Sequence, residues 1–186
     1  MLNEQIIVDA TAHLDQRRAN VADLDYEQPV ACQFSSQQIQ NGARQQALKR
    51  WLARRLGENV RRPALYVIEV NNQDAALVIR AAFDAAKQVA NRGYALPKRN
   101  GEIELSPVLY VGSSQKDIQR RLLQHLWQAP IKTYALNLNR WMPAINGTVR
   151  VSVQSIPGAV NPVVVQDAED ALWRSLRPMF GKSGGR

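Results

Sequence analysis

The sequence predicts one domain that combines helices with a small β-sheet, preceded by a mostly helical extension. Three short segments, 64–70, 107–113 and 148–156, have the composition and length of β-strands. Each of them is followed by a segment in which apolar residues recur at helical spacing. With 186 residues, the chain is long enough for such a domain to bury a core.

The predicted extension covers residues 1–62 and changes charge along its length. Residues 1–34 hold six acids against two arginines, and their pattern indicates short helices. From Ser36 to Leu56 apolar residues recur at helical spacing, and Gly57 supplies a helix stop. The other face of this helix carries an arginine cluster that includes Arg50, Arg54 and Arg55. This cluster is either a phosphate-binding surface or a solvated helix face.

The predicted core domain covers residues 63–181. After its first strand, a helix is expected over 73–92, where a glycine follows as a stop. A second helix over 117–127 begins at an aspartate suited to the N-cap, and a last helix over 166–177 ends before a proline. Residues 182–186 are expected to form a flexible tail. Taken alone, this alternation of strands and helices is typical of a parallel sheet.

The composition indicates a polyanionic partner. The formal net charge is +8 and the isoelectric point about 10.1, so clustered Lys and Arg would attract phosphates and release counterions. No long apolar run predicts a membrane span, and the N-terminus lacks the pattern of a signal peptide. A single cysteine, Cys32, excludes an internal disulfide framework, and no Cys/His cluster predicts a zinc site. A cytoplasmic protein is expected.

Five residues could carry chemistry. Arg121 and His125 lie one turn apart on the border of an apolar helical stripe, where charged groups can reach into a cleft. Glu169 continues the apolar stripe of the last helix, and a carboxylate there is costly unless it is paired or binds a metal. Tyr66 and Tyr110 lie on strands, where tyrosines are usually packing residues. A basic helix rim and cross-strand packing are the competing interpretations of these patterns.

The core domain resembles the GIY-YIG nuclease family. Its residues 64–66, Ala-Leu-Tyr, are similar to the family's Gly-Ile-Tyr, and residues 110–112, Tyr-Val-Gly, are similar to its Tyr-Ile-Gly. Arg121 and His125 resemble the family's catalytic arginine and the histidine one turn later. Glu169, followed nine residues later by a proline, resembles the metal-ligand helix.

The resemblance implies an α+β fold with a small three-stranded antiparallel sheet flanked by helices. Residues 71–106 would then be a helix-bearing insertion between the two tyrosine motifs, as in some restriction-enzyme-like members. The sequence also departs from the family pattern. Ala64 replaces the first glycine, and Gly181 stands where the family often has an asparagine.

The resemblance also implies a role for each candidate residue. Glu169 would hold one divalent ion, usually Mg²⁺, with Mn²⁺ as an alternative. Tyr66 or Tyr110 would activate the attacking water, Arg121 would stabilise the charged transition state, and His125 would orient the water or the tyrosine. Further candidates for the site are Tyr134 and Lys182. The basic side chains expected to contact nucleic acid are Arg50, Arg54, Arg55, Lys98, Arg99, Lys116 and Arg120.

Together these patterns predict a divalent-metal-dependent DNA endonuclease, with restriction or phage defence as the favoured setting. RNA is not excluded as a substrate, and a homodimer on DNA is an open arrangement. Two other classes compete with this prediction: a catalytically silent nucleic-acid-binding module, and a small metabolic enzyme that binds anionic ligands. Metal-dependent cleavage would separate the first of these from a nuclease.

Overall fold

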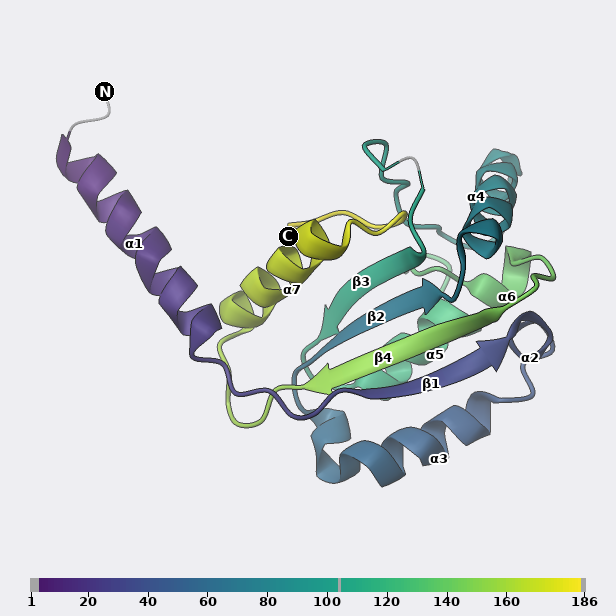
Figure 1. Ribbon diagram of the computed structural model, residues 1–186, viewed down its shortest axis with the longest axis horizontal. Helices are drawn as coiled ribbons and strands as arrows, with labels where there is room; N and C mark the ends of the chain where they lie inside the picture. Colours follow the sequence, from purple (N-terminus) through teal and green to yellow (C-terminus); the bar gives the residue numbers. More distant parts are fainter. Residues whose placement is uncertain (1–3, 104, 185–186) are drawn as a thin grey trace.

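The computed structural model describes residues 4–103 and 105–184 and has an α+β fold (Figure 1). Four strands form one antiparallel sheet in the order β1-β4-β2-β3. The strands are β1 Val30–Ser35, β2 Ala64–Val70, β3 Val108–Ser114 and β4 Thr148–Ser155. The antiparallel α+β class is therefore confirmed.

The prediction of three strands was wrong, because the segment before residue 63 contributes the edge strand β1. Val30 of this strand pairs with Val153 of β4, and Phe34 pairs with Val149. Phe34 is buried in the main core, and Val30 and Cys32 pack against it, so alternate side chains of β1 face the helices. The alternation covers only six residues, so the mixed composition of residues 1–34 indicated short helices instead.

Seven α-helices and one 3₁₀ helix are found in the described residues. They are α1 Glu4–Ala22, α2 Ser36–Gln40, α3 Gln45–Leu56, η1 Gly57–Arg61, α4 Gln73–Gln88, α5 Ile118–Leu126, α6 Leu138–Trp141 and α7 Pro162–Leu176. The single helix expected from Ser36 is broken, because Gly42 adopts a positive φ of 65° between α2 and α3. The last helix begins earlier than expected, since Asn161 caps it and Pro162 occupies its first turn.

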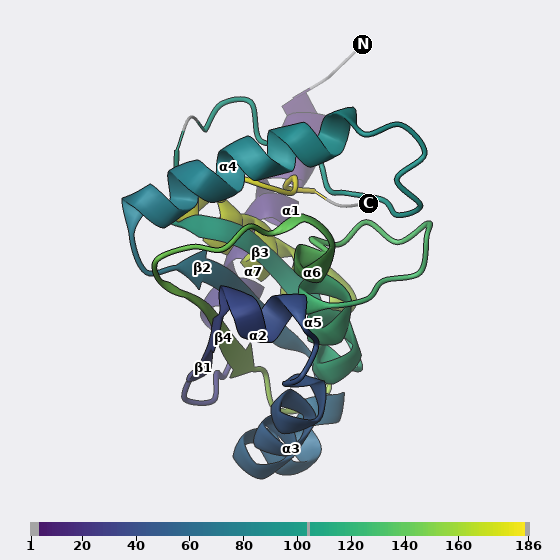
Figure 2. The same cartoon turned by 90° about the vertical axis from the view of Figure 1, so that its right-hand side faces the viewer.

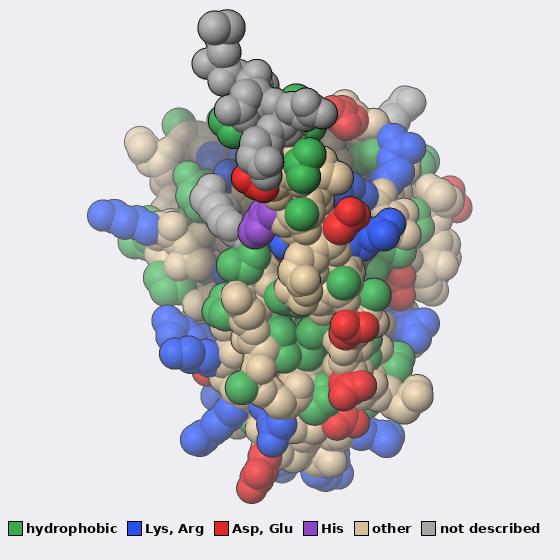
Figure 3. Space-filling view, turned by 90° about the vertical axis from the view of Figure 1, so that its left-hand side faces the viewer, with side chains coloured by type: hydrophobic (Ala, Val, Ile, Leu, Met, Phe, Trp, Pro, Cys, Tyr) green, Lys and Arg blue, Asp and Glu red, His purple; other side chains and the backbone are tan. Residues whose placement is uncertain are grey.

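The N-terminal helix α1 extends away from the rest of the molecule (Figure 1). It contacts α7 near its C-terminal end, where Arg17 forms an ion pair with Asp167. Val21 and Leu24 pack there against the buried residues beneath α7. On the face that carries α1, Lys and Arg side chains lie around the margin (Figure 3).

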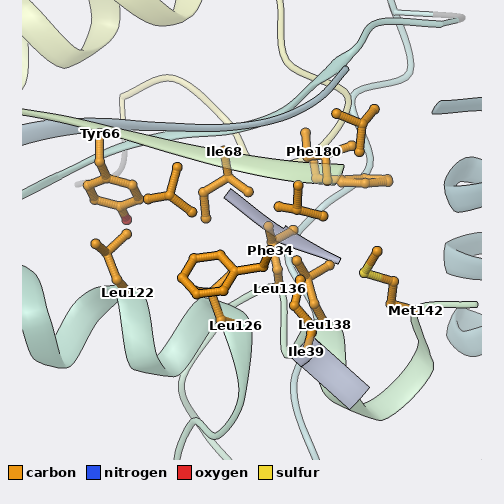
Figure 4. Close-up of a cluster of buried hydrophobic side chains, with 14 of the residues drawn as sticks. Phe34, Ile39, Tyr66, Ile68, Leu122, Leu126, Leu136, Leu138, Met142 and Phe180 are labelled. Atoms are coloured by element: carbon orange, nitrogen blue, oxygen red, sulfur yellow. The ribbon is translucent and has the colours of Figure 1, made fainter. Parts of the chain in front are cut away.

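The sheet has helices on both of its faces. Tyr66 and Ile68 of β2 belong to the main core together with Leu122 and Leu126 of α5, and their side chains point from the sheet toward that helix (Figure 4). The intervening strand positions face the other way. Leu65 accordingly packs in a second cluster with residues of α7. Helices α5 and α7 therefore cover opposite faces, and β3 lies at the sheet edge between them.

The connection from β2 to β3 carries α4, which packs into the same main core as α3 and lies at the opposite end of the view in Figure 2. Beyond α4, this connection runs beside the segment that follows α7. The backbone N–H of Asn100 donates to the carbonyl of Met179, and that of Gly181 donates to the carbonyl of Lys98, both at 2.8 Å. The segment that follows α7 also covers the outer edge of β3, because Met179 N–H donates to the Val108 carbonyl at 2.9 Å. The expected helical connection thus packs against the C-terminal segment.

Among residues 4–103 and 105–184, no helix combines the length and the apolar character needed to cross a membrane.

Candidate active site

The two strand tyrosines lie on the same face of neighbouring strands. Tyr66 of β2 pairs with Gly112 of β3, and Tyr110 of β3 pairs with Ile68. Their rings are nearly parallel, with centroids 6.2 Å apart and an interplanar angle of 12°. Gly112 leaves room for the Tyr66 phenol, because a Cβ at this position would lie 2.4 Å from the Tyr66 hydroxyl oxygen. Tyr66 therefore needs a glycine at position 112, the last residue of the Tyr-Val-Gly tripeptide, to occupy this position.

Helix α5 brings Arg121 and His125 to the Tyr66 hydroxyl. Arg121 Nε donates to this oxygen at 3.2 Å, and His125 Nε2 lies 2.9 Å from it. The other ring nitrogen of His125 accepts a hydrogen bond from the backbone N–H of Leu136 at 3.2 Å. In neutral His125 the proton is therefore on Nε2, which donates to Tyr66. The Tyr66 oxygen thus accepts two N–H donors, and its own proton has no acceptor among the described residues.

Burial decides the protonation states of this group. It lowers the pKa of His125 well below the ordinary value, and the nearby Arg121 charge acts in the same direction. Burial also raises the pKa of Tyr66, with a further contribution from Tyr110, while the Arg121 charge opposes this rise. The pKa of Tyr110 is raised by burial too, and Arg121 again opposes the shift. At neutral pH the site therefore contains a neutral imidazole, two neutral phenols and a guanidinium.

The Arg121 guanidinium is fixed by several contacts with the protein. Besides Tyr66, it donates through Nη1 to Gln124 Oε1 at 3.2 Å and through Nη2 to the Tyr134 carbonyl at 3.4 Å. A guanidinium has five N–H bonds. These contacts, together with a side-chain interaction with Tyr110, fix the plane of the guanidinium.

Glu169 lies on α7 and approaches the site from the other face of the sheet. The Ser113 hydroxyl at the end of β3 donates to Glu169 Oε2 at 2.6 Å. Burial raises the pKa of Glu169, although the Ser113 hydrogen bond and the Arg121 charge oppose the shift. Within the described residues, Glu169 has no ion pair. It is a partly buried carboxylate that a cation would stabilise.

These side chains open onto one cleft of about 770 Å³. Its lining residues come from β2, β3, α5, α7, the connection before β3, the segment between α5 and α6, and the segment after α7. They are Tyr66, Pro97, Lys98, Tyr110, Gly112, Ser113, Arg121, Tyr134, Gln166, Glu169, Gly181 and Lys182. His125 is fully buried behind Tyr66 and does not line the cleft. The structure therefore brings the sequence-predicted residues Tyr66, Tyr110, Arg121, Glu169, Tyr134 and Lys182 into one cleft, with His125 supporting them.

Part of the cleft lining is built from two segments that are distant in the sequence. Lys98 comes from the connection before β3, and Lys182 follows Gly181, whose N–H donates to the Lys98 carbonyl. Gly181 has a φ of +99°, and a Cβ there would lie 3.1 Å from the Tyr110 ring. A residue with a side chain would therefore be strained at this position.

The other basic residues expected to contact nucleic acid are dispersed. Arg99 lines a hollow that adjoins the cleft and forms an ion pair with Asp84 at 3.3 Å. Arg50 and Arg54 line a separate shallow pocket on α3. The remaining three, Arg55, Lys116 and Arg120, are exposed and do not line the cleft. The structure therefore does not gather this set around one site.

Sequence reasoning missed the residues that hold the others in place. Ser113 orients Glu169, Gln124 and the Tyr134 carbonyl orient Arg121, and the backbone of Leu136 fixes the His125 tautomer. The signal for Ser113 was its position directly after the Tyr-Val-Gly tripeptide. The Leu136 and Tyr134 contacts involve backbone atoms, so the residue types in the sequence do not predict them.

No family model, curated protein or solved structure matches this chain. Among residues 4–103 and 105–184, no three His, Cys, Asp or Glu side chains gather into a group that could hold a metal ion. A cation at this site would therefore take its protein ligands from Glu169 and neutral oxygens, together with water and substrate.

Proposed function

We propose that this chain is a divalent-metal-dependent endonuclease that hydrolyses phosphodiester bonds in DNA, with the chemistry of the GIY-YIG family that it resembles. The observation that carries the proposal is the shared contact of Arg121 and His125 with the Tyr66 hydroxyl, in a cleft that also contains Glu169. An acid–base group, a fixed cation and a carboxylate that can bind a metal are the groups that phosphodiester hydrolysis requires.

Arg121 is the expected contact for the scissile phosphate. Its contacts with the protein fix the guanidinium at the cleft, where it can bind non-bridging phosphate oxygens. Lys98 and Lys182 also line the cleft and add positive charge that DNA phosphates would neutralise. A phosphodiester lying in the cleft would therefore meet several cationic side chains.

Tyr66 is better placed than Tyr110 to act as the general base. The N–H groups of Arg121 and His125 both point at the Tyr66 oxygen and stabilise its phenolate. In that form, Tyr66 takes a proton from water as the water oxygen bonds to phosphorus. The bond from phosphorus to the leaving oxygen breaks, and this oxygen takes a proton from solvent. Arg121 stabilises the charge that develops on the phosphate.

Glu169 is the residue that would hold the divalent ion. Its raised pKa and its lack of an ion pair among the described residues fit a carboxylate whose charge is balanced by a cation. A bound Mg²⁺ or Mn²⁺ would supply positive charge to polarise the phosphate. Ser113 would keep the carboxylate turned toward the cleft through its 2.6 Å hydrogen bond.

The test is cleavage of plasmid and branched DNA with Mg²⁺ or Mn²⁺ by four variants. Glu169→Gln and Arg121→Ala are expected to lower the cleavage rate by a factor on the order of 100 or more. Asp74→Asn and Arg140→Ala are matched controls, because both residues are exposed and lie outside the cleft. They should cut at a rate within a few-fold of the wild type. Cutting that survives both cleft substitutions would place the active site elsewhere.

The alternative is a nucleic-acid-binding module without catalytic activity. Gly181, in the place of the family's frequent asparagine, is the feature that favours it. Such a module would bind DNA in a salt-sensitive manner and yield no product with either metal. A role in restriction or phage defence, and a homodimer on DNA, remain predictions that follow from the nuclease proposal.

A further inference from the structure

The segment between α5 and α6 presents two large side chains to solvent at the rim of the cleft. Ile131 is 70% exposed and Tyr134 is 68% exposed. Tyr134 also lines the cleft beside Arg121 and Pro97. Other aromatic residues nearby, such as Tyr66 and Trp127, are fully packed in the core. An aromatic ring left open beside a catalytic arginine therefore needs a separate explanation.

This segment is anchored by the active site itself. The Tyr134 carbonyl accepts from Arg121, and Leu136 N–H donates to His125 Nδ1. At its tip, the Ile131 carbonyl accepts from the backbone N–H of Ala95 at 3.0 Å. The Tyr134 ring is therefore exposed although its segment is held by hydrogen bonds. The backbone on both sides of Tyr134 is held in place, so the ring is presented in a defined position.

Tyr134 borders the same cleft as Arg121 and Tyr66. The Arg121 guanidinium contacts both the Tyr66 hydroxyl and the Tyr134 carbonyl, so a phosphate bound to Arg121 would lie in the cleft that Tyr134 borders. A base attached to the neighbouring sugar can reach an aromatic face at the rim. Stacking on an aromatic side chain is how proteins commonly bind bases that are not paired in a duplex.

We propose that Tyr134 is the stacking platform for an unpaired nucleobase next to the scissile phosphate, an inference that rests on the proposed nuclease function. The substrate class is then a nucleic acid with an unpaired base at the cleavage site, such as a single strand or a branch point. The ring of Tyr134 makes this contact, and its hydroxyl is not required. Tyr134→Phe should therefore keep the binding of the unpaired base, and Tyr134→Ala should lose it.

The experiment measures binding without cleavage, in EDTA, by fluorescence anisotropy. The probes are a labelled oligothymidylate and an abasic oligonucleotide of the same length and the same number of phosphates. The wild type and Tyr134→Phe should bind the base-bearing strand about tenfold more tightly than the abasic one. Tyr134→Ala should bind both strands with the same affinity. Tyr26→Ala is the matched control, because Tyr26 is 39% exposed and outside the cleft, and it should keep the preference.

The outcomes separate this inference from the function on which it rests. Equal affinity of the wild type for both strands would overturn the stacking role, while metal-dependent plasmid cleavage would leave the nuclease in place. Loss of the preference in Tyr134→Phe would also overturn it, because the hydroxyl and not the ring would then be responsible. Failure of the wild type to bind either strand, combined with no cleavage, would contradict both proposals.

Discussion

Replacing Gly112 with alanine should displace Tyr66 and inactivate the protein. The added Cβ would lie 2.4 Å from the Tyr66 hydroxyl oxygen and 2.6 Å from its Cζ, roughly 1 Å inside an ordinary van der Waals contact. Tyr110 blocks the other side, since its Cε1 would be 2.9 Å from the same Cβ. Overpacking of this kind costs ~1–3 kcal/mol. Moving Tyr66 also weakens two hydrogen bonds of ~1 kcal/mol each.

The assay is urea unfolding of the purified variant, followed by its rate of DNA cleavage. We expect Gly112→Ala to lose about 3 kcal/mol of unfolding free energy and to cut on the order of 100-fold more slowly. Gly101→Ala is the control, because a Cβ at Gly101 meets no atom within 4 Å. In a Tyr66→Ala background, Gly112→Ala should cost much less, since the main obstacle is gone. A Gly112→Ala protein as stable and as active as the wild type would refute this account of the glycine.

Three further predictions follow from the site. Because the folded-state pKa of Glu169 is raised, its ionised form favours the unfolded chain. Glu169→Gln should therefore raise the Tm at pH 7 in EDTA. The difference in Tm from the wild type should vanish below about pH 4, near the ordinary Glu pKa. A Tm for this variant at or below the wild-type value at pH 7 would contradict the burial argument. Since the folded-state pKa of His125 is lowered, the unfolded chain binds more protons below about pH 6.5, so stability should fall with acidification by up to ~1.4 kcal/mol per pH unit. This slope should shrink in His125→Gln and persist in His13→Gln, a change at an exposed residue; an unchanged slope in His125→Gln would argue against a buried neutral imidazole. Arg121→Lys keeps the charge but loses the fork that contacts Tyr66, Gln124 and Tyr134, so its kcat should fall about as far as that of Arg121→Ala; near-wild-type kcat would show that charge alone suffices.

The sequence predicted the fold best where a local pattern was complete. The strand at 64–70 and the cap of α5 at Asp117 were located correctly, because a short apolar run and a side-chain cap are local signals. Strand β1 was missed because its six residues mix small and polar side chains, and its pairing partner β4 lies more than a hundred residues away. The break between α2 and α3 was missed because a positive φ at Gly42 is not encoded by hydrophobic spacing.

The candidate site was predictable as a set of residue types but not as an arrangement. Helical spacing placed Arg121 and His125 on one face, and the structure shows both at the Tyr66 hydroxyl. The contact between Ser113 and Glu169 joins residues 56 positions apart across two elements, so no local pattern predicts it. The cleft wall at Lys98 likewise depends on backbone pairing with the segment after α7. Such contacts follow from tertiary packing, which spacing rules do not describe.

The most direct test of the account is the pH dependence of cleavage by the wild type and by Tyr66→Phe, measured with saturating Mg²⁺. Because burial raises the Tyr66 pKa, the phenolate fraction grows with pH, and the wild-type rate should rise about tenfold per pH unit through the neutral range. Tyr66→Phe keeps the ring and its packing, so it should fold normally and cut at least ~100-fold more slowly. A Tyr66→Phe protein that cuts at the wild-type rate, with the same pH profile, would contradict the proposed role of this site.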